Sequence, residues 1–338
     1  FFPGVKNEDL KYTNLKKFIP ESISVQPFKT IENQNTLINL NKFYKNQSVP
    51  KKNVVFFIDG VLQEDLSDIP FGLKIKRFTT NETKTQSLYL NKSGLSFNAA
   101  KNGFYQGFSS FLKKNKLIEL NAYLTDLPYL LTFSDSFSQE NPLKIIHAFS
   151  NQNAFFNQNR LLFLIEKNSK VLIEEEVINF GVENCVFNMV SEFICLENSS
   201  LNFYATQNDL TKSSLINTIF CAQQKNSSSN FNVFSLNGKL IRNNILVELL
   251  GVKSSSNVFG TSLLRGSEHL DNFITISHLI ESCKSNQLFK SVYDGNSSGS
   301  FCGKIFVEKG AQQTEAFQQN NNLMISKGAR DNAKPQLE

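Results

Sequence analysis

A small polar cluster recurs at nearly constant spacing through the C-terminal half of the 338-residue chain. The clusters read KNSK, ENSS, KNSSS, KSSSN and ESCKS. A fixed period in this range indicates stacked structural repeats. Short runs of Val, Ile, Leu and Phe separate the clusters, which is typical of strands between turns. We therefore predict a mainly β chain that forms a β-solenoid. The marker serines are Ser169, Ser199, Ser227, Ser254 and Ser282, at steps of 30, 28, 27 and 28 residues.

Blocks of amide side chains precede apolar runs at two places. Residues 318–322 read QQNNN before LMI, and residues 157–159 read NQN shortly before LLF. In a solenoid, successive coils stack about 4.8 Å apart, so amides at one position can bond to polar groups one coil away. We predict that these blocks form corners of the coils.

The first third of the chain lacks this periodicity. We predict a helical and mixed α/β region over residues 1–105 and the β-helix core over residues 106–338. Residues 7–9, with the sequence Asn-Glu-Asp, are expected to cap a helix that ends at Pro20, and residues 35–44 are expected to form a second helix. Residues 54–58 predict a strand, and the Asp59–Gly60 pair predicts a tight hairpin turn after it.

Composition excludes several classes of protein. The net charge of +5 is modest and the charges are interspersed, which argues against a nucleic-acid partner. No apolar run approaches the roughly 20 residues of a membrane span. The five cysteines are odd in number and form no C-x-x-C pair, so we expect reduced thiols in a cytoplasmic protein and no structural zinc. The first residues, FFPGVKNEDL, do not resemble a secretory leader.

Several stretches of the sequence match one known pattern, namely residues 304–307, 310–318, 320, 322–323, 326 and 335–338, together with residues 238–244 and 269–271. They resemble the core of the SufB/SufD family, the scaffold subunits of the Suf iron–sulfur cluster assembly complex. Residues 6–15 and 55–60 are similar to the SufD branch of that family. The resemblance covers nearly the whole chain and implies a right-handed parallel β-helix.

The resemblance implies a scaffold subunit that is not an enzyme on its own. Its partners would be a SufB-like scaffold and a SufC-like ATPase, and an iron–sulfur cluster would form in the complex. Reduced flavin is a candidate ligand of that complex, whereas this chain alone is expected to bind no cofactor. Two departures stand out. Asn272 occupies a position where the family usually has histidine, and the C-terminal helical domain that follows Pro-Gln-Leu-Glu in the family is expected to be absent.

Three residues are candidates for chemistry. His269 and Asp271 alternate onto one face of a strand, where they form either a metal or proton site or an outward polar ladder. His278 falls on the opposite face, as a hydrogen-bonded core or rim histidine. Cys302, like Cys283, is either a sulfur-carrying thiol or a small apolar filler.

The last coils are the expected partner surface, because open strand edges are usually covered by pairing. A polysaccharide-cleaving β-helix enzyme is the alternative function, and it requires clustered carboxylates. Asp209, Asp271, Asp294 and Asp331 are scattered, and the Glu174–Glu176 run is expected to be a solvated strand end. The predicted interface residues are Lys304, Gln318, Asn320, Asn322, Gln336 and Glu338.

Overall fold

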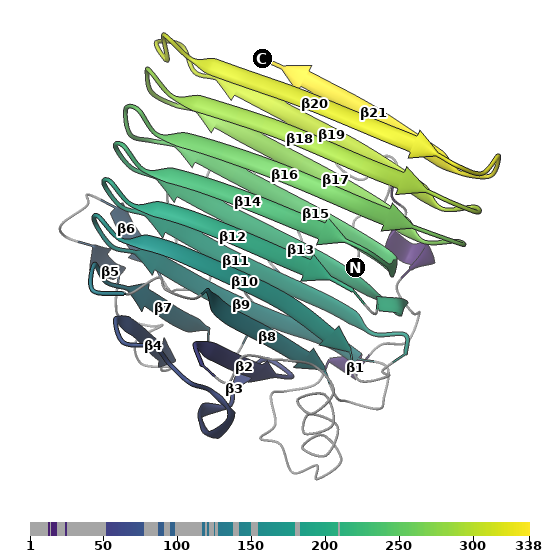
Figure 1. Ribbon diagram of the computed structural model, residues 1–338, viewed down its shortest axis with the longest axis horizontal. Coiled ribbons are helices and arrows are strands. Elements are labelled where there is room, and N and C mark those ends of the chain that lie inside the picture. Colours follow the sequence, from purple (N-terminus) through teal and green to yellow (C-terminus); the bar gives the residue numbers. More distant parts are fainter. Residues whose placement is uncertain are drawn as a thin grey trace.

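Strands dominate the structure, a computed structural model, and they stack into two large sheets (Figure 1). Each coil gives one strand to each sheet, and the coils follow one another in sequence order up to the C-terminus. The structure describes residues 13, 15–18, 24–25, 52–77, 87–90, 95–98, 117–118, 120–121, 125, 128–137, 142–149, 155–179, 183–208 and 210–338.

Sheet A is ten-stranded within these residues, and sheet B is nine-stranded. Sheet A runs in the order β21 (Arg330–Leu337), β19 (Ser298–Val307), β17 (His269–His278), β15 (Gly238–Leu249), β13 (Leu210–Gln223), β11 (Val186–Cys195), β9 (Phe155–Ile165), β7 (Tyr129–Phe133) and β4 (Leu73–Arg77), with β1 (Ser24–Val25) also on β9. Sheet B runs in the order β20 (Glu315–Met324), β18 (Lys284–Tyr293), β16 (Ser255–Leu264), β14 (Ser228–Ser235), β12 (Ser200–Gln207), β10 (Lys170–Asn179), β8 (Leu143–Phe149), β2 (Val54–Ile58) and β3 (Val61–Leu62).

The strands from β8 onward pair in parallel, which confirms the predicted parallel β-solenoid. Antiparallel pairs join β2 to β3, β4 to β7, and β5 (Ser87–Leu90) to β6 (Leu95–Asn98). In the part of the chain that the structure describes, the helical elements are short: the 3-10 turns η2 (Leu15–Lys17) and η3 (Glu64–Leu66) and a helical segment that includes residues 117–118 and 120–121. No helix in the described part of the chain is long and apolar enough to cross a membrane.

The interior between the two sheets is filled by alternate residues of every strand. In β14, Phe231 and Val233 point inward and are buried, while their neighbours are half-buried on the outer face. Phenyl rings stack from coil to coil. The Phe163 and Phe193 centroids lie 4.4 Å apart, and Phe203 meets Phe193 edge-on from sheet B at 5.0 Å. The period-two pattern of the sequence therefore builds one continuous core.

The recurring polar clusters form one corner of the coils, as predicted. Asn168, Asn198 and Asn226 have φ of 62°, 59° and 56°, a left-handed conformation that asparagine tolerates. Their amides form a ladder, with Asn198 donating to Asn168 at 3.2 Å and Asn226 donating to Asn198 at 3.1 Å. In the fifth cluster, Ser282 takes the left-handed position and Cys283 the inward position that serine holds in earlier coils. The predicted marker Ser282 is thus displaced by one residue.

The amide blocks lie in strands, so their prediction as corners was wrong. Gln318, Asn320 and Asn322 point into the coil from β20, and the two amides between them are exposed. Interior amides find partners on the preceding coil, as when Gln318 donates to Gln287 at 2.9 Å. Deeper in the stack, Asn243 donates to Asn272 at 3.0 Å. A polar row can therefore occupy a strand interior, provided that the next coil supplies its partner.

The predicted N-terminal hairpin is confirmed. Asp59 and Gly60 have φ of 49° and 88° and connect β2 to β3. Since β2 also pairs in parallel with β8, the hairpin extends sheet B. Of the first predicted helix, the described residues contain the turn η2. The expected helix over residues 35–44 and the domain boundary at 105/106 lie outside the described residues.

Candidate functional site

His269 and Asp271 point away from the interior on β17, because Ile274 and Ile276 on the same strand belong to the core. Both are nevertheless buried, at 7% and 4% exposure. Thr13 and residues 15–18, called the N-terminal segment below, cover this outer face of sheet A, with Thr13 fully buried and Leu15 in an apolar cluster with Phe156 and Leu240. The predicted outward ladder is thus present, but it is shielded from solvent.

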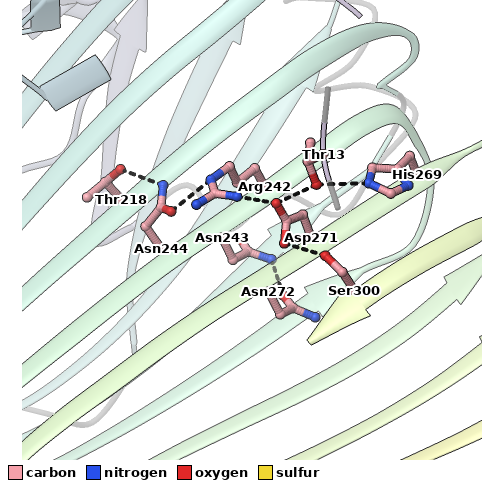
Figure 2. A network of polar contacts seen from close by, with 9 residues as sticks. All are labelled: Thr13, Thr218, Arg242, Asn243, Asn244, His269, Asp271, Asn272 and Ser300. Atoms are coloured by element: carbon pink, nitrogen blue, oxygen red, sulfur yellow. Dashed lines mark hydrogen bonds and ion pairs between the residues drawn. The ribbon is translucent and has the colours of Figure 1, made fainter. Parts of the chain in front are cut away.

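An ion pair occupies the centre of this buried network (Figure 2). Arg242 on β15 donates through Nη1 to Asp271 Oδ2 and through Nε to Asn244 Oδ1 at 2.9 Å. Asn244 in turn donates to Thr218 at 3.2 Å on β13. Ser300 on β19 donates to the other carboxylate oxygen of Asp271. Four adjacent coils are therefore linked by charge-assisted and neutral hydrogen bonds, which satisfy a charge that burial would otherwise penalise.

Thr13 fastens the N-terminal segment to this network (Figure 2). Its hydroxyl donates its one proton to Asp271 Oδ2 at 2.6 Å, so it must accept at His269 Nε2, 3.1 Å away. His269 therefore carries a proton on Nε2, and its Nδ1 lies within hydrogen-bonding distance of Ser298 Oγ, at 2.8 Å. Burial lowers the pKa of His269, with the Asp271 carboxylate opposing and the Arg242 cation adding to the effect. The ring of Phe18 stacks on the imidazole at 5.3 Å.

These contacts favour a structural role, in which the network holds the N-terminal segment on sheet A, over metal binding. Both ring nitrogens of His269 have hydrogen-bond partners, and Asp271 is engaged by Arg242, Ser300 and Thr13. Among the described residues, no three His, Cys, Asp or Glu side chains gather as a metal site. Cys302 lies half-buried on the same face of β19 as Ser300, opposite Phe273 and Lys334 of the flanking strands.

The six predicted interface residues divide between the inner face of sheet B and the outer face of sheet A, and Lys304 lies on β19, one coil below the others. Gln318, Asn320 and Asn322 form the inward row described above. On the outer face of sheet A, Lys304 lies opposite Gln336 and pairs with Glu338 at 2.8 Å. The outer edges of β20 and β21 pair with no other described strand. Large apolar side chains are exposed around them, namely Phe317 (64%), Leu323 (59%), Met324 (50%), Ile325 (64%) and Leu337 (73%).

Comparison with known proteins agrees with this architecture. The family model described as "SUF system FeS cluster assembly, SufBD core domain" matches residues 147–338. The chain belongs to the SufBD family. The match begins on β8, at the first of the regular coils, and runs through the last one. It confirms the resemblance drawn from the sequence motifs.

Individual SufBD relatives are moderately similar. The chain is 32% identical over 192 residues to the iron-sulfur cluster assembly SufBD family protein slr0076 of Synechocystis, covering 54% of this chain and 42% of the relative. It is 28% identical over 229 residues to the iron-sulfur cluster assembly protein SufD of Bacillus subtilis, covering 66% and 52%. It is 31% identical over 105 residues to SufD of Escherichia coli, covering 31% and 25%. The matches thus span about half or less of these relatives.

Two buried polar pairs of the SufBD core escaped sequence analysis, a hydrogen-bonded histidine–glutamate pair and an arginine–glutamate ion pair. Glu175 was expected on a solvated strand end, but it is buried at 3% and bonds to His147 at 3.1 Å inside the first regular coil. The expectation fails because the middle residue of the glutamate run points opposite to its neighbours. His147 precedes Glu175 by 28 residues, the length of one coil, and that spacing was the available signal. On the outer face, Arg160 pairs with Glu192 beneath the helical segment, and burial raises the pKa of Glu192 against the opposing effect of Arg160.

The candidate cysteine and carboxylates of the SufBD core are placed as follows. Cys283 is fully buried beside Ser254 at 3.4 Å, as expected of a small filler. Asp294 accepts from Ser326, and Asp331 accepts from Tyr293 at 3.2 Å. Asp209 lies outside the described residues. The aspartates that the polysaccharide-cleaving alternative would use therefore each bond to a nearby side chain, as far as the structure describes them.

His278 is the hydrogen-bonded core histidine that was predicted, with Nε2 2.8 Å from Ser285 Oγ. Burial lowers its pKa from 6.5 to about 4. The His278 imidazole takes up a proton near pH 6.5 in the unfolded chain but only near pH 4 in the folded chain. Lowering the pH from 6.5 to about 4 therefore reduces the free energy of unfolding. We expect His278→Gln to lose less stability than the wild type from pH 6.5 to about 4, measured by urea unfolding at several pH values. Parallel pH dependence of the two proteins would contradict this.

Proposed function

We propose that this chain is a SufD-like scaffold subunit of a SufBCD iron–sulfur cluster assembly complex. It pairs with a SufB-like scaffold through its last coil and works with a SufC-like ATPase. Membership of the SufBD family supports this role, and so does the name SufD that two relatives carry. The role proposed is a non-catalytic one in the cytoplasm.

The unpaired outer edges of β20 and β21 are the observation on which the proposal rests. The outer edges of β20 and β21 present backbone donors and acceptors, flanked by the exposed Phe317, Leu323 and Leu337. Unpaired edges with apolar side chains recruit further strands, and natural proteins usually cover them. A second solenoid with a matching edge satisfies both the backbone and the apolar surface.

The cluster belongs, in this proposal, to the assembled complex. Thiolate ligands of a cluster must be accessible to iron. Cys185, Cys195, Cys221 and Cys283 are buried in this chain, and Cys302 is half-buried. Reduced flavin likewise remains a candidate ligand of the complex. The polysaccharide-cleaving alternative gains no support from the carboxylates described above.

Co-expression with the SufB-like and SufC-like proteins of the same genome tests the proposal. We expect an affinity-tagged chain to co-purify with the SufB-like partner, and Phe317→Lys with Leu323→Lys to abolish recovery by placing charges on the edge. Phe71→Lys is the matched control, because Phe71 is 84% exposed on the turn before β4, outside the last coil. Failure of the wild-type chain to recover any SufB-like protein would refute the proposal.

A further inference from the structure

The interior of the last coil differs from the interiors beneath it. Phe231 and Val258 precede Gln287 and Gln318 at one register position of sheet B. At the next inward position, Val233, Gly260 and Phe289 precede Asn320. A third position carries serine in the three preceding coils and then Asn322. On the inner face of sheet B, two of these positions therefore change from apolar to amide side chains towards the outer edge of β20, and the third changes from serine to asparagine.

The coil beneath is shaped to hold these amides. A Cβ at Gly303 would lie 1.7 Å from Gln318 Nε2, so glycine leaves the space that this amide occupies. Gly299 does the same for the Tyr293 hydroxyl, which donates to Asp331. Asn322 donates to the same carboxylate at 2.6 Å. The polar row is thus built into the fold.

Two of the amide groups have no partner in the free chain. Asn320 Nδ2 and Asn322 Oδ1 are shielded from solvent and lack a hydrogen bond. Such groups destabilise a protein, since water satisfies them in the unfolded chain. An apolar layer stacked on this coil would enclose the row further without satisfying it. A partner coil with amides at the same positions would offer both a donor and an acceptor to each side chain of the row, as in stacked amide ladders.

We propose that the inward row of Gln318, Asn320 and Asn322 selects the partner, and that the SufB-like coil stacked on β20 presents inward Asn or Gln side chains at the matching positions. This inference rests on the proposed pairing. Opposite the row, Ala333 and Leu337 of β21 are exposed and apolar, so the partner's other strand is apolar there. The recognised surface has a polar and an apolar half.

Leucine substitutions in the row are expected to affect the stability of the free chain and the affinity for the partner differently. In the isolated chain, Asn320→Leu is expected to leave the urea midpoint unchanged or raised, because it removes an unsatisfied group. Asn322→Leu also deletes the hydrogen bond to Asp331, so its midpoint is expected to fall. In the complex both substitutions are expected to raise the Kd for the purified SufB-like protein about tenfold each, since the facing amides lose their partners. Gln319→Leu and Asn321→Leu are matched controls on the exposed face of the same strand, and should change neither quantity. Asn320→Ala repeats the test without added volume.

Each outcome decides the inference. Loss of affinity confined to the inward variants, with the free chain intact, supports it. Equal or tighter binding by those variants overturns it, and leaves the proposed pairing standing. Equal losses of affinity from the inward and the outward variants also overturn it. So does a finding that the chain associates with itself and that Asn320→Leu abolishes this self-association. Absence of binding by the wild type refutes the proposed function itself, and the inference with it.

Discussion

Replacing Asp271 with alanine is expected to destabilise the chain by about 3–5 kcal/mol, because it leaves the guanidinium of Arg242 buried without its counter-ion. Arg242 is among the largest fully buried side chains of the protein. The substitution also removes the acceptor of Thr13 and Ser300. Urea unfolding followed by circular dichroism gives the change in free energy of unfolding.

Two controls separate the buried charge from general damage. The double variant Arg242→Met with Asp271→Leu is expected to recover much of the loss, since apolar pairs often replace buried ion pairs at little cost. Glu315→Ala breaks the exposed pair with Lys284 and should change stability by no more than about 1 kcal/mol. An Asp271→Ala protein as stable as the wild type would show that Arg242 gains solvent or another partner.

Phe193→Ala is expected to destabilise the chain by about 3–5 kcal/mol, the usual cost of deleting a buried aromatic ring. Phe193 is fully buried and meets Phe163, Phe203 and Phe231 from both sheets. The rigid strands on either side limit collapse into the cavity. The same urea experiment measures the loss.

Phe317→Ala is the comparison, because Phe317 is 64% exposed in the free chain. It should alter the free energy of unfolding by about 0.5 kcal/mol or less. Equal effects of the two substitutions would contradict the assignment of Phe193 to the core.

The solenoid could be predicted from the sequence because its corners repeat chemically. A left-handed residue followed by a small inward one recurs at each turn, and Asn198 and Ser199 show why: one tolerates the backbone and the other bonds the carbonyl of Leu196 at 2.6 Å. Cys283 takes the inward position that serine holds in the earlier clusters, with a side chain of similar size. The last predicted marker was therefore placed one residue too early, at Ser282.

The network could not be predicted, because its members are far apart in the chain. Thr13 lies 258 residues from Asp271, and no local pattern marks a threonine as its partner. The motif that contains Arg242 was recognised only as a resemblance. The polar residues of the interior were also missed, because Glu175 and Asn320 stand where alternation predicts an apolar side chain. Glu175 bonds to His147 one coil away, whereas Asn320 lies opposite Phe289 and its Nδ2 has no partner.

The N-terminal segment changes how such a stack comes apart. Coils that touch only their neighbours can detach one after another from an end, with stability adding up repeat by repeat. Here Leu15 belongs to one apolar cluster with residues of β9, β11, β13 and β15, and Thr13 bonds to Asp271 on β17, so one short stretch of chain is linked to five coils. We therefore expect these coils to unfold together rather than in sequence.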